Sequence, residues 1–244
     1  MRRLLSFFRE LLASGPSPED QLGVTVPETL CLDCDTIYLT FDDGPHPERT
    51  LRILDTLAAH DVKATFFVVG ENIAGNEDIL RRARDEGHII ANHQWVHEVA
   101  PSESLFRTWV TETRDRLHAL VGDMPLYFRY PYGKATNWKQ KLLRNDYGYA
   151  DGGIGWHLDS CDWAYEVVAG SLASPEVRAK AVAFLPPAHG DDMAGHVVSC
   201  ARERRGGVLL MHDDKHVTAE CLDSLLAKLE DAGFQFGQFP LGER

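Results

Sequence analysis

The sequence predicts an α/β protein in which a mostly parallel sheet is covered by helices. Short apolar runs rich in β-branched and aromatic residues alternate with segments of helical periodicity between residues 36 and 240. This alternation is typical of β-α-β units, whose helices connect parallel strands. The length of 244 residues suits one large domain of this class.

The first half of the chain contains well-separated elements. Residues 36–41 form a predicted strand that ends at two adjacent carboxylates, Asp42 and Asp43, before a Gly-Pro turn. The next predicted elements are a helix over 48–59, a strand over 64–69, a helix over 76–86, a strand over 88–92 and a helix over 102–121, with Ser102 as N-cap and Gly122 as C-terminal stop.

The second half continues the same alternation. No internal repeat or interdomain linker follows residue 35, so residues 36–244 are expected to form one domain. Residues 1–35 are expected to form an N-terminal arm or a weak targeting segment. The predicted strands of this half cover 126–130, 149–158, 207–211 and 234–239, and its predicted helices cover 138–144, 175–185, 193–204 and 217–232.

Composition and charge limit the classes of function. Hydrophobic residues make up 44% and charged residues 25%, as in ordinary soluble globular proteins. Acidic residues outnumber basic residues by 37 to 25, and the formal net charge of -12 argues against nucleic acid as a partner. A neutral glycan remains compatible with this charge.

The N-terminal residues do not form a clean export signal. Arg9 and Glu10 interrupt the apolar stretch after Met1, so a short amphipathic helix explains it equally well. No other stretch approaches the ~18 apolar residues that a membrane span needs. The five cysteines form neither a convincing zinc site nor a redox motif, and a bond between Cys161 and Cys200 stays open.

Polar side chains stand where the predicted strands end. The carboxyl ends of parallel strands form the active face of barrels and open α/β sheets. Because adjacent side chains of an extended segment diverge, one acid of the first strand can bind a metal while the other transfers a proton. Taken alone, the same two acids also suit a solvated turn. The residues at the strand ends are Asp42, Asp43, His93, Arg129, Asp159 and His212.

Two His-x-x-x-His sequences compete for a metal-binding role. If the segment is helical, His93 and His97 lie on one face and could hold a divalent ion. His212 and His216 have the same spacing. The first pair follows a strand near the expected position of Asp43, which would complete a set of two imidazoles and one carboxylate with open positions for water. Position therefore favours the first pair.

Three further residues each have two interpretations. Arg129 could hold a catalytic carboxylate by a charge-assisted bond, or it could lie exposed beside a turn. Trp163 could stack on a sugar ring or belong to the core. His212 could transfer a proton, or it could be a hydrogen-bonded residue of a buried strand.

Taken together, these residues resemble the five motifs of the NodB-like polysaccharide deacetylases, carbohydrate esterase family 4. Each motif is weak alone, but five in the family's order are very specific. The resemblance covers residues 36–240. The matching segments are Thr40-Phe41-Asp42-Asp43-Gly44, His93-x-x-x-His97, Arg129-x-Pro131-Tyr132-Gly133, Asp159-x-x-Asp162-Trp163 and Leu210-x-His212.

The resemblance implies a distorted (β/α) barrel and a metal-dependent hydrolase that removes N-acetyl, sometimes O-acetyl, groups from glycans. Carried over by motif, the metal is a divalent ion, most often Zn²⁺ with Co²⁺ or others as alternatives. The implied metal ligands are Asp43, His93 and His97. The implied general base is Asp42, oriented by Arg129, and the implied general acid is His212, held by Asp159. The implied substrate-binding residues are Tyr132, which gives a backbone N–H to the oxyanion, Pro131, Trp163 and Leu210.

The expected substrate is an acetylated N-acetylhexosamine glycan, such as peptidoglycan, chitin oligomers or an exopolysaccharide, which would place the protein in the cell envelope or periplasm. Two departures from the family pattern are visible: Gln94 replaces a Ser or Thr, and the stretch between Trp163 and His212 is long. Two other functions remain open, a non-catalytic glycan-binding protein and an amidohydrolase of small cyclic amides. The retention of the acid, the base and all three ligands weighs against the first, and the retention of Asp42, both histidines and Trp163 weighs against the second.

Overall fold

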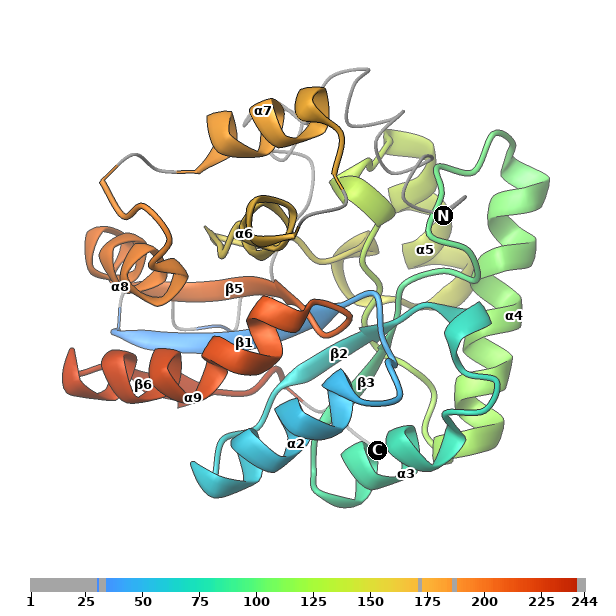
Figure 1. Cartoon of the computed structure of the whole chain (residues 1–244). Coiled ribbons are helices and arrows are strands. Elements are labelled where there is room, and N and C mark those ends of the chain that lie inside the picture. Colours follow the sequence, from blue (N-terminus) through green and yellow to red (C-terminus); the bar gives the residue numbers. More distant parts are fainter. Residues whose placement is uncertain (1–29, 31–33, 171–172, 186–187, 241–244) are drawn as a thin grey trace.

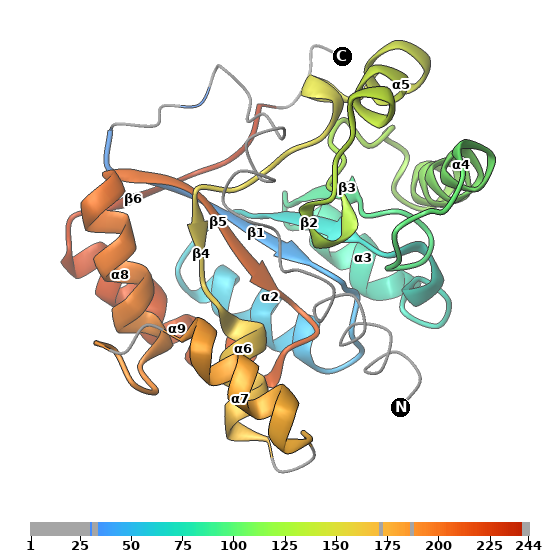
Figure 2. The same cartoon turned by 90° about the horizontal axis from the view of Figure 1, so that it is seen from above.

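The computed structural model describes residue 30 and residues 34–170, 173–185 and 188–240. A parallel sheet runs through the middle of the molecule, and helices cover its outer face (Figure 1, Figure 2). The expected α/β class is confirmed. Residues 1–29, which include most of the predicted N-terminal arm, lie outside the described part of the chain.

Strand β1 (Thr36–Asp42) is the centre of the sheet. It pairs in parallel with β5 (Gly206–His212) along its whole length, and this register sets Asp42 beside His212. The described strands follow the order β3-β2-β1-β5-β4. On one side β1 pairs with β2 (Thr65–Val68), which pairs with β3 (Ile89–Asn92), and on the other side β5 pairs with β4 (Leu158–Asp159). Strand β6 (Gln235–Gly237) pairs with the first residues of β1.

Irregular segments join the two ends of this sheet into a distorted barrel. Asn92 of β3 forms a parallel bridge with Phe128, whose carbonyl accepts the N–H of Ile154 at 2.7 Å. The chain enters β4 four residues later. The strands expected over 126–130 and 149–158 are therefore wrong in detail: the structure has one isolated bridge in the first and a 3₁₀ turn, η4 (Ala150–Gly152), in the second. Positive φ angles at three successive residues from Asp151 prevent a strand there.

The described helices lie largely where periodicity placed them. Ser102 caps α4 by accepting the N–H of Leu105, and Gly122 ends it in the left-handed conformation. Helix α6 was not predicted. The helices are α2 (Arg49–Ala59), α3 (Glu77–Asp85), α4 (Glu103–Val121), α5 (Asn137–Tyr147), α6 (Asp162–Ala169), α7 (Pro175–Phe184), α8 (Met193–Arg204) and α9 (His216–Asp231), with 3₁₀ turns η2 (Gly70–Asn72) and η3 (Pro131–Gly133).

Alternation along β1 separates two cores. Ile37, Leu39 and Phe41 pack outward under the helices, whereas Tyr38 belongs to a second cluster with residues of the neighbouring strands. Asp42 shares the inward side of Tyr38. The strand thus delivers a carboxylate to the mouth of the barrel.

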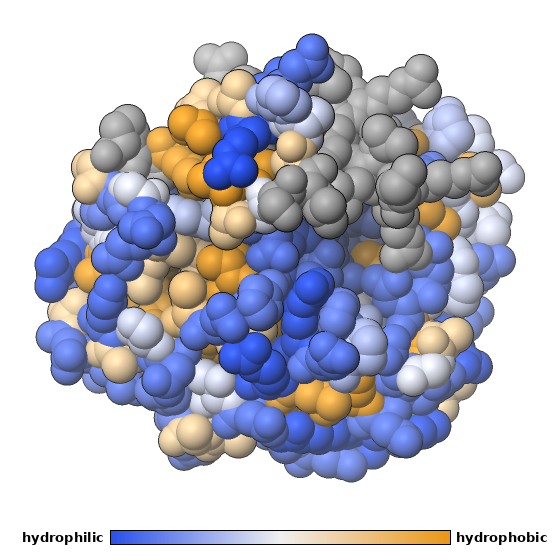
Figure 3. Space-filling model, viewed as in Figure 1, coloured by the Kyte–Doolittle hydropathy of each residue, from blue (hydrophilic) through white to orange (hydrophobic). Residues whose placement is uncertain are grey.

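The outer surface is mostly hydrophilic in the view of Figure 3, with a hydrophobic group over α7. Two residues of that helix, Val182 and Phe184, have half or more of their surface exposed. Among the described helices, none has the length and apolar character to cross a membrane.

The described cysteines do not form the bond that the sequence left open. Cys161, Cys200 and Cys221 are free thiols, and the Sγ of Cys200 lies 3.6 Å from Nδ1 of His196. Cys34 is disulfide-bonded.

Candidate functional site

Asp42 and Asp43 leave β1 in different directions. Asp42 is buried with 4% of its surface exposed, on the inward side of the strand. Asp43 follows the strand with a φ of 78°, in the left-handed region. This local turn directs the two adjacent carboxylates to different partners, as the sequence suggested.

Asp43, His93 and His97 converge on one point. The Oδ1 atom of Asp43 lies 3.4 Å from Nε2 of His93 and 3.2 Å from Nε2 of His97. One ligand atom from each residue lies within 4.8 Å of the other two. Asp43 Oδ1 is buried and accepts no hydrogen bond from the described residues. A cation bound between the imidazoles would satisfy it, so these residues fit a divalent metal ion.

The protonation states suit metal binding. His93 Nδ1 lies 2.8 Å from the Arg129 carbonyl, which can only accept, so Nδ1 carries the proton and Nε2 presents its lone pair. Burial lowers the pKa of His97 to about 4 against the attraction of Asp43, which leaves the ring neutral near pH 7. Burial opposes ionisation of Asp43, yet His97 and His93 hold its pKa well below the ordinary value. Asp43 is therefore anionic and His97 neutral, which are the forms of these side chains that bind a metal ion.

The segment from His93 to His97 is a loop, so the helical arrangement considered from the spacing is wrong. Gln94 adopts a φ of 70°, and its Nε2 donates to the carbonyls of Val96 and Glu98, both at 2.9 Å. These bonds close the loop and bring the two imidazole centroids to 5.1 Å. The departure from the family pattern at residue 94 therefore has a structural function.

Asp42 is held by a buried arginine. Arg129 has no exposed surface, and its Nη1 donates to Asp42 Oδ1 at 2.7 Å and to Thr40 Oγ1 at 2.8 Å. The guanidinium stacks 4.1 Å from the centroid of Phe67 inside the barrel. The other oxygen, Asp42 Oδ2, lies 3.8 Å from Nε2 of His93. The arginine fixes one oxygen and leaves the second facing the metal ligands.

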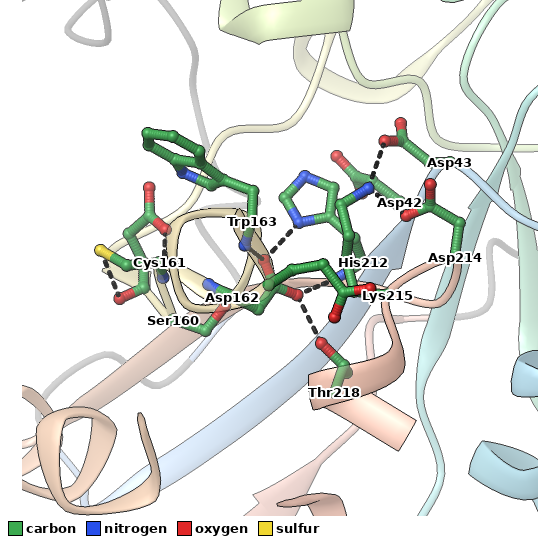
Figure 4. A network of polar contacts seen from close by, with 12 residues as sticks. Asp42, Asp43, Ser160, Cys161, Asp162, Trp163, His212, Asp214, Lys215 and Thr218 are labelled. Carbon is green, nitrogen blue, oxygen red and sulfur yellow. Dashed lines mark hydrogen bonds and ion pairs between the residues drawn. The ribbon is translucent and has the colours of Figure 1, made fainter. Parts of the chain in front are cut away.

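His212 is paired with a fully buried carboxylate, Asp162 (Figure 4). His212 Nδ1 lies 2.7 Å from Asp162 Oδ1, which also accepts the N–H of Trp163. Asp162 Oδ2 accepts the backbone N–H of His212 at 2.6 Å and the hydroxyl of Thr218 at 2.7 Å. Burial alone would lower the pKa of His212, but Asp162 raises it to about 10. The imidazole is therefore protonated at neutral pH.

The expectation that Asp159 holds His212 is wrong. Asp159 Oδ1 accepts the N–H of Cys161 at 2.8 Å and so stabilises the turn before α6. Cys161 has a φ of 55°, which reverses the chain and aims Asp162, the first residue of α6, at the histidine. Asp159 and Asp162 both lie near the end of a strand. The turn at Cys161 determines that Asp162, and not Asp159, contacts His212.

Tyr132 lies at the other side of the metal ligands. It has a φ of 58° within η3, and its ring centroid lies 4.4 Å from that of His97. The Tyr132 hydroxyl donates to the His97 carbonyl at 3.3 Å. Pro131, also expected to contact substrate, is buried beside it.

Trp163 and Leu210 flank the other side, next to His212. Leu210 is buried two residues before the histidine in β5. Trp163 is half-buried in the first turn of α6, and the ring of Phe184 from α7 packs edge-on against it at 5.0 Å. Phe184 belongs to the long stretch before β5 and was not predicted to approach the site.

The second His-x-x-x-His pair, His212 and His216, does not form a metal site, because His216 lies on the surface. His216 has 56% of its side chain exposed and lies 3.2 Å from Glu220 on α9. Within the same segment, however, sequence reasoning missed Lys215, whose Nζ lies 3.8 Å from Asp43 Oδ2 and forms an ion pair with Asp214. A lysine three residues after His212, the last residue of a predicted site strand, is the signal that could have identified it.

Comparisons with known proteins identify the family of this chain. The model of the polysaccharide deacetylase family matches residues 30–150. Over 213 residues, the chain is 31% identical to the chitooligosaccharide deacetylase of Bradyrhizobium sp. (strain ANU 289), covering 84% of this chain and 89% of that protein. The chain belongs to the polysaccharide deacetylase family.

Other members of the polysaccharide deacetylase family extend this comparison. The chain is 32% identical over 202 residues to the peptidoglycan-N-acetylglucosamine deacetylase PgdA of Listeria monocytogenes, covering 82% of this chain. It spans only 37% of the length of that protein. Among solved structures, the polysaccharide deacetylase Bc1974 of Bacillus cereus has a TM-score of 0.68 and 26% identity, covering 86% of this chain and 94% of that one.

Proposed function

We propose that this chain is a metal-dependent N-deacetylase that hydrolyses the acetamido group of an N-acetylhexosamine glycan. One observation supports this proposal most strongly. The ligand atoms of Asp43, His93 and His97 lie together, and Asp42 Oδ2 lies next to His93. The β1–β5 register places His212 beside Asp42. Amide hydrolysis needs a polarised carbonyl, an activated water and a proton for the departing amine. The two strand ends supply groups for all three needs.

Asp43, His93 and His97 would hold the divalent ion. Two imidazoles and one carboxylate suit Zn²⁺ best, and Co²⁺ can take the same ligands. When bound, such an ion polarises the amide carbonyl and lowers the pKa of a water molecule toward ~7.

Asp42 acts as the general base. Its Oδ1 is fixed by Arg129, so Oδ2 is the oxygen that accepts the proton of the attacking water. Because the arginine is buried and makes further bonds to the carbonyls of Ile154 and Gly155, the carboxylate cannot rotate away. The pair keeps the base oriented through the reaction.

His212 acts as the general acid. Asp162 accepts the Nδ1 proton, so the Nε2 proton is the one that passes to the leaving nitrogen. After the transfer the ring is neutral and remains anchored by the same hydrogen bond. Asp162 is thus the positioning residue of the acid, in the place first assigned to Asp159.

The remaining residues would bind the substrate. The backbone N–H of Tyr132 would stabilise the oxyanion, and Leu210 and Trp163 would line a pocket for the acetyl methyl group beside Pro131. The names of the relatives point to N-acetylglucosamine in peptidoglycan or chitin oligomers as the substrate class. An exopolysaccharide of the same sugar offers the same acetamido group.

The test is acetate release by the zinc-loaded protein from N-acetylglucosamine oligomers, peptidoglycan glycan strands and small cyclic amides. Release from a glycan, lost on chelation and restored by Zn²⁺ or Co²⁺, is the expected result. Asp42→Asn should keep bound metal and lose turnover, which separates chemistry from folding. Activity that is indifferent to chelators would reject the metal role.

The two alternative functions give different outcomes in the same screen. A non-catalytic glycan-binding protein would bind the oligomers and release no acetate from any of them. An amidohydrolase of small amides would act on the cyclic amides and spare the glycans. Retention of base, acid and ligands in one rim favours the deacetylase.

A further inference from the structure

Lys215 places a positive charge against the carboxylate of the proposed metal site. It is the residue before α9, and its Nζ lies 3.8 Å from Asp43 Oδ2. Only 17% of the Lys215 side chain and 15% of the Asp43 side chain are exposed. Figure 4 shows the ammonium group between Asp43 and Asp214.

The two oxygens of Asp43 have different tasks because of this contact. Oδ1 faces the Nε2 atoms of His93 and His97, at 3.4 and 3.2 Å, whereas Oδ2 faces Lys215. Rotation of the carboxylate about its last bond would break the ion pair. Lys215 therefore favours a geometry in which Asp43 offers a single oxygen to an ion.

The ammonium group is held in place from the other side. Lys215 forms its closer ion pair with Asp214, whose carbonyl accepts a hydrogen bond from Nη1 of Arg49 at 2.5 Å. A lysine ammonium group carries a positive charge at neutral pH, and its two carboxylate neighbours, Asp214 and Asp43, favour that charge. The group is consequently a fixed cation at neutral pH, near the point where a divalent ion would bind.

We propose that Lys215 is an internal counter-cation that competes with the divalent ion for Asp43, lowers the affinity of the site for that ion and restricts Asp43 to one ligand oxygen. The inference rests on the proposed metal site and adds a residue that regulates its occupancy. Like charges at short range in a partly buried site repel strongly, so the lysine raises the concentration of free metal at which the site fills.

The experiment measures zinc affinity by competition with a fluorescent zinc chelator for the wild type, Lys215→Met and Lys215→Arg. Lys215→Met is expected to bind zinc at least tenfold more tightly, and Lys215→Arg close to the wild type because it keeps the charge. Lys228→Met is the matched control, since it removes a lysine of α9 that forms an exposed ion pair with Asp192, the N-cap residue of α8. Its zinc affinity should be unchanged.

Thermal unfolding gives a second readout that a merely structural role would not reproduce. Chelator-treated Lys215→Met should melt at a lower temperature than the wild type, because Asp43 loses its counter-cation, and zinc should raise its Tm by more. If Lys215→Met does not fold without zinc, Lys215→Gln, which keeps a polar group of similar length, replaces it in both measurements.

The proposal that Lys215 acts as a counter-cation is overturned if Lys215→Met or Lys215→Gln binds zinc no more tightly than the wild type. An equal zinc-induced rise in Tm for variant and wild type would do the same. Failure of the proposed function looks different: wild-type zinc binding would then be absent, or would survive His93→Ala and His97→Ala.

Discussion

Replacement of Asp162 by Asn tests whether a buried carboxylate keeps the general acid protonated. Asp162 raises the pKa of His212 from the ordinary 6.5 to about 10. A group whose folded pKa is raised contributes stability that is fully present below the unfolded pKa and is lost as the pH rises through the folded pKa. The contribution is therefore complete below pH 6.5 and disappears through pH 10.

The magnitude follows from the pKa values. Three units between pH 7 and the folded pKa of about 10 correspond to about 4 kcal/mol, at roughly 1.4 kcal/mol per unit. Breaking a buried ion pair by removing one partner costs about 3–5 kcal/mol, which agrees. The substitution also replaces one acceptor oxygen by a donor nitrogen, although Thr218 and two backbone N–H groups need acceptors there. Asp162→Asn should lose about 3–4 kcal/mol at pH 7, and less near pH 10.

The assays are urea unfolding at pH 7 and pH 10 and the pH profile of kcat/KM for acetate release. In Asp162→Asn the imidazole pKa falls to 6.5 or below, because burial lowers it once the carboxylate is gone, so at most about 3% of the acid is protonated at pH 8 and kcat/KM falls at least about thirtyfold. The matched control is Asp159→Asn, whose amide oxygen can still accept the N–H of Cys161. The pH profile of kcat/KM for Asp159→Asn should fall at high pH where that of the wild type does.

The reasoning fails if the basic limb of Asp162→Asn coincides with that of the wild type, or if Asp159→Asn shifts it instead. In the second case, Asp159 would hold the acid as first expected from the motif. Direct titration of the imidazole by ¹⁵N NMR separates a shifted pKa from a slower chemical step.

Three further predictions test other parts of the site. Asp42→Asn should bind zinc as the wild type does and lose about 10²–10⁴ in kcat, and an unchanged kcat would remove Asp42 as the base. Gln94→Ala removes the two hydrogen bonds that close the loop between His93 and His97. Chelator competition should show about tenfold weaker zinc binding, a loss of about 1.4 kcal/mol in binding free energy. An affinity equal to that of the wild type would contradict this role of the Gln94 amide. Gly44→Ala would force a Cβ into the buried Asp213 carboxylate and should destabilise by about 3 kcal/mol or more in urea, whereas Gly75→Ala, with open space at its Cβ, should lose only about 1 kcal/mol.

Periodicity and strand-end chemistry predicted most of the framework. Strand β1 was predicted from its apolar, β-branched and aromatic residues and from the acids at its end. The structure adds that its residues alternate between two cores. The helices with clear caps, such as α4 between Ser102 and Gly122, were placed closely. The segment 149–158 was misassigned because its apolar residues suit a strand, while the positive φ of Asp151 and its neighbours is decided by tertiary hydrogen bonds.

The site residues divide in the same way. Asp43 and His93 were found because each follows a strand, and parallel strands bring their ends together whatever the intervening loops do. His97 was found through its His-x-x-x-His spacing from His93. The partner of His212 was assigned wrongly because the choice between Asp159 and Asp162 depends on one left-handed residue.

The charge pairing of the rim explains where a cation belongs. The anionic base Asp42 has a dedicated buried partner in Arg129, and the cationic acid His212 has one in Asp162. Asp43 differs, because its only described lysine partner is shared with Asp214 and reaches one oxygen alone. The surplus negative charge of the site therefore lies on Asp43, whose Oδ1 faces the imidazoles of His93 and His97, and this carboxylate is where a cation would be held.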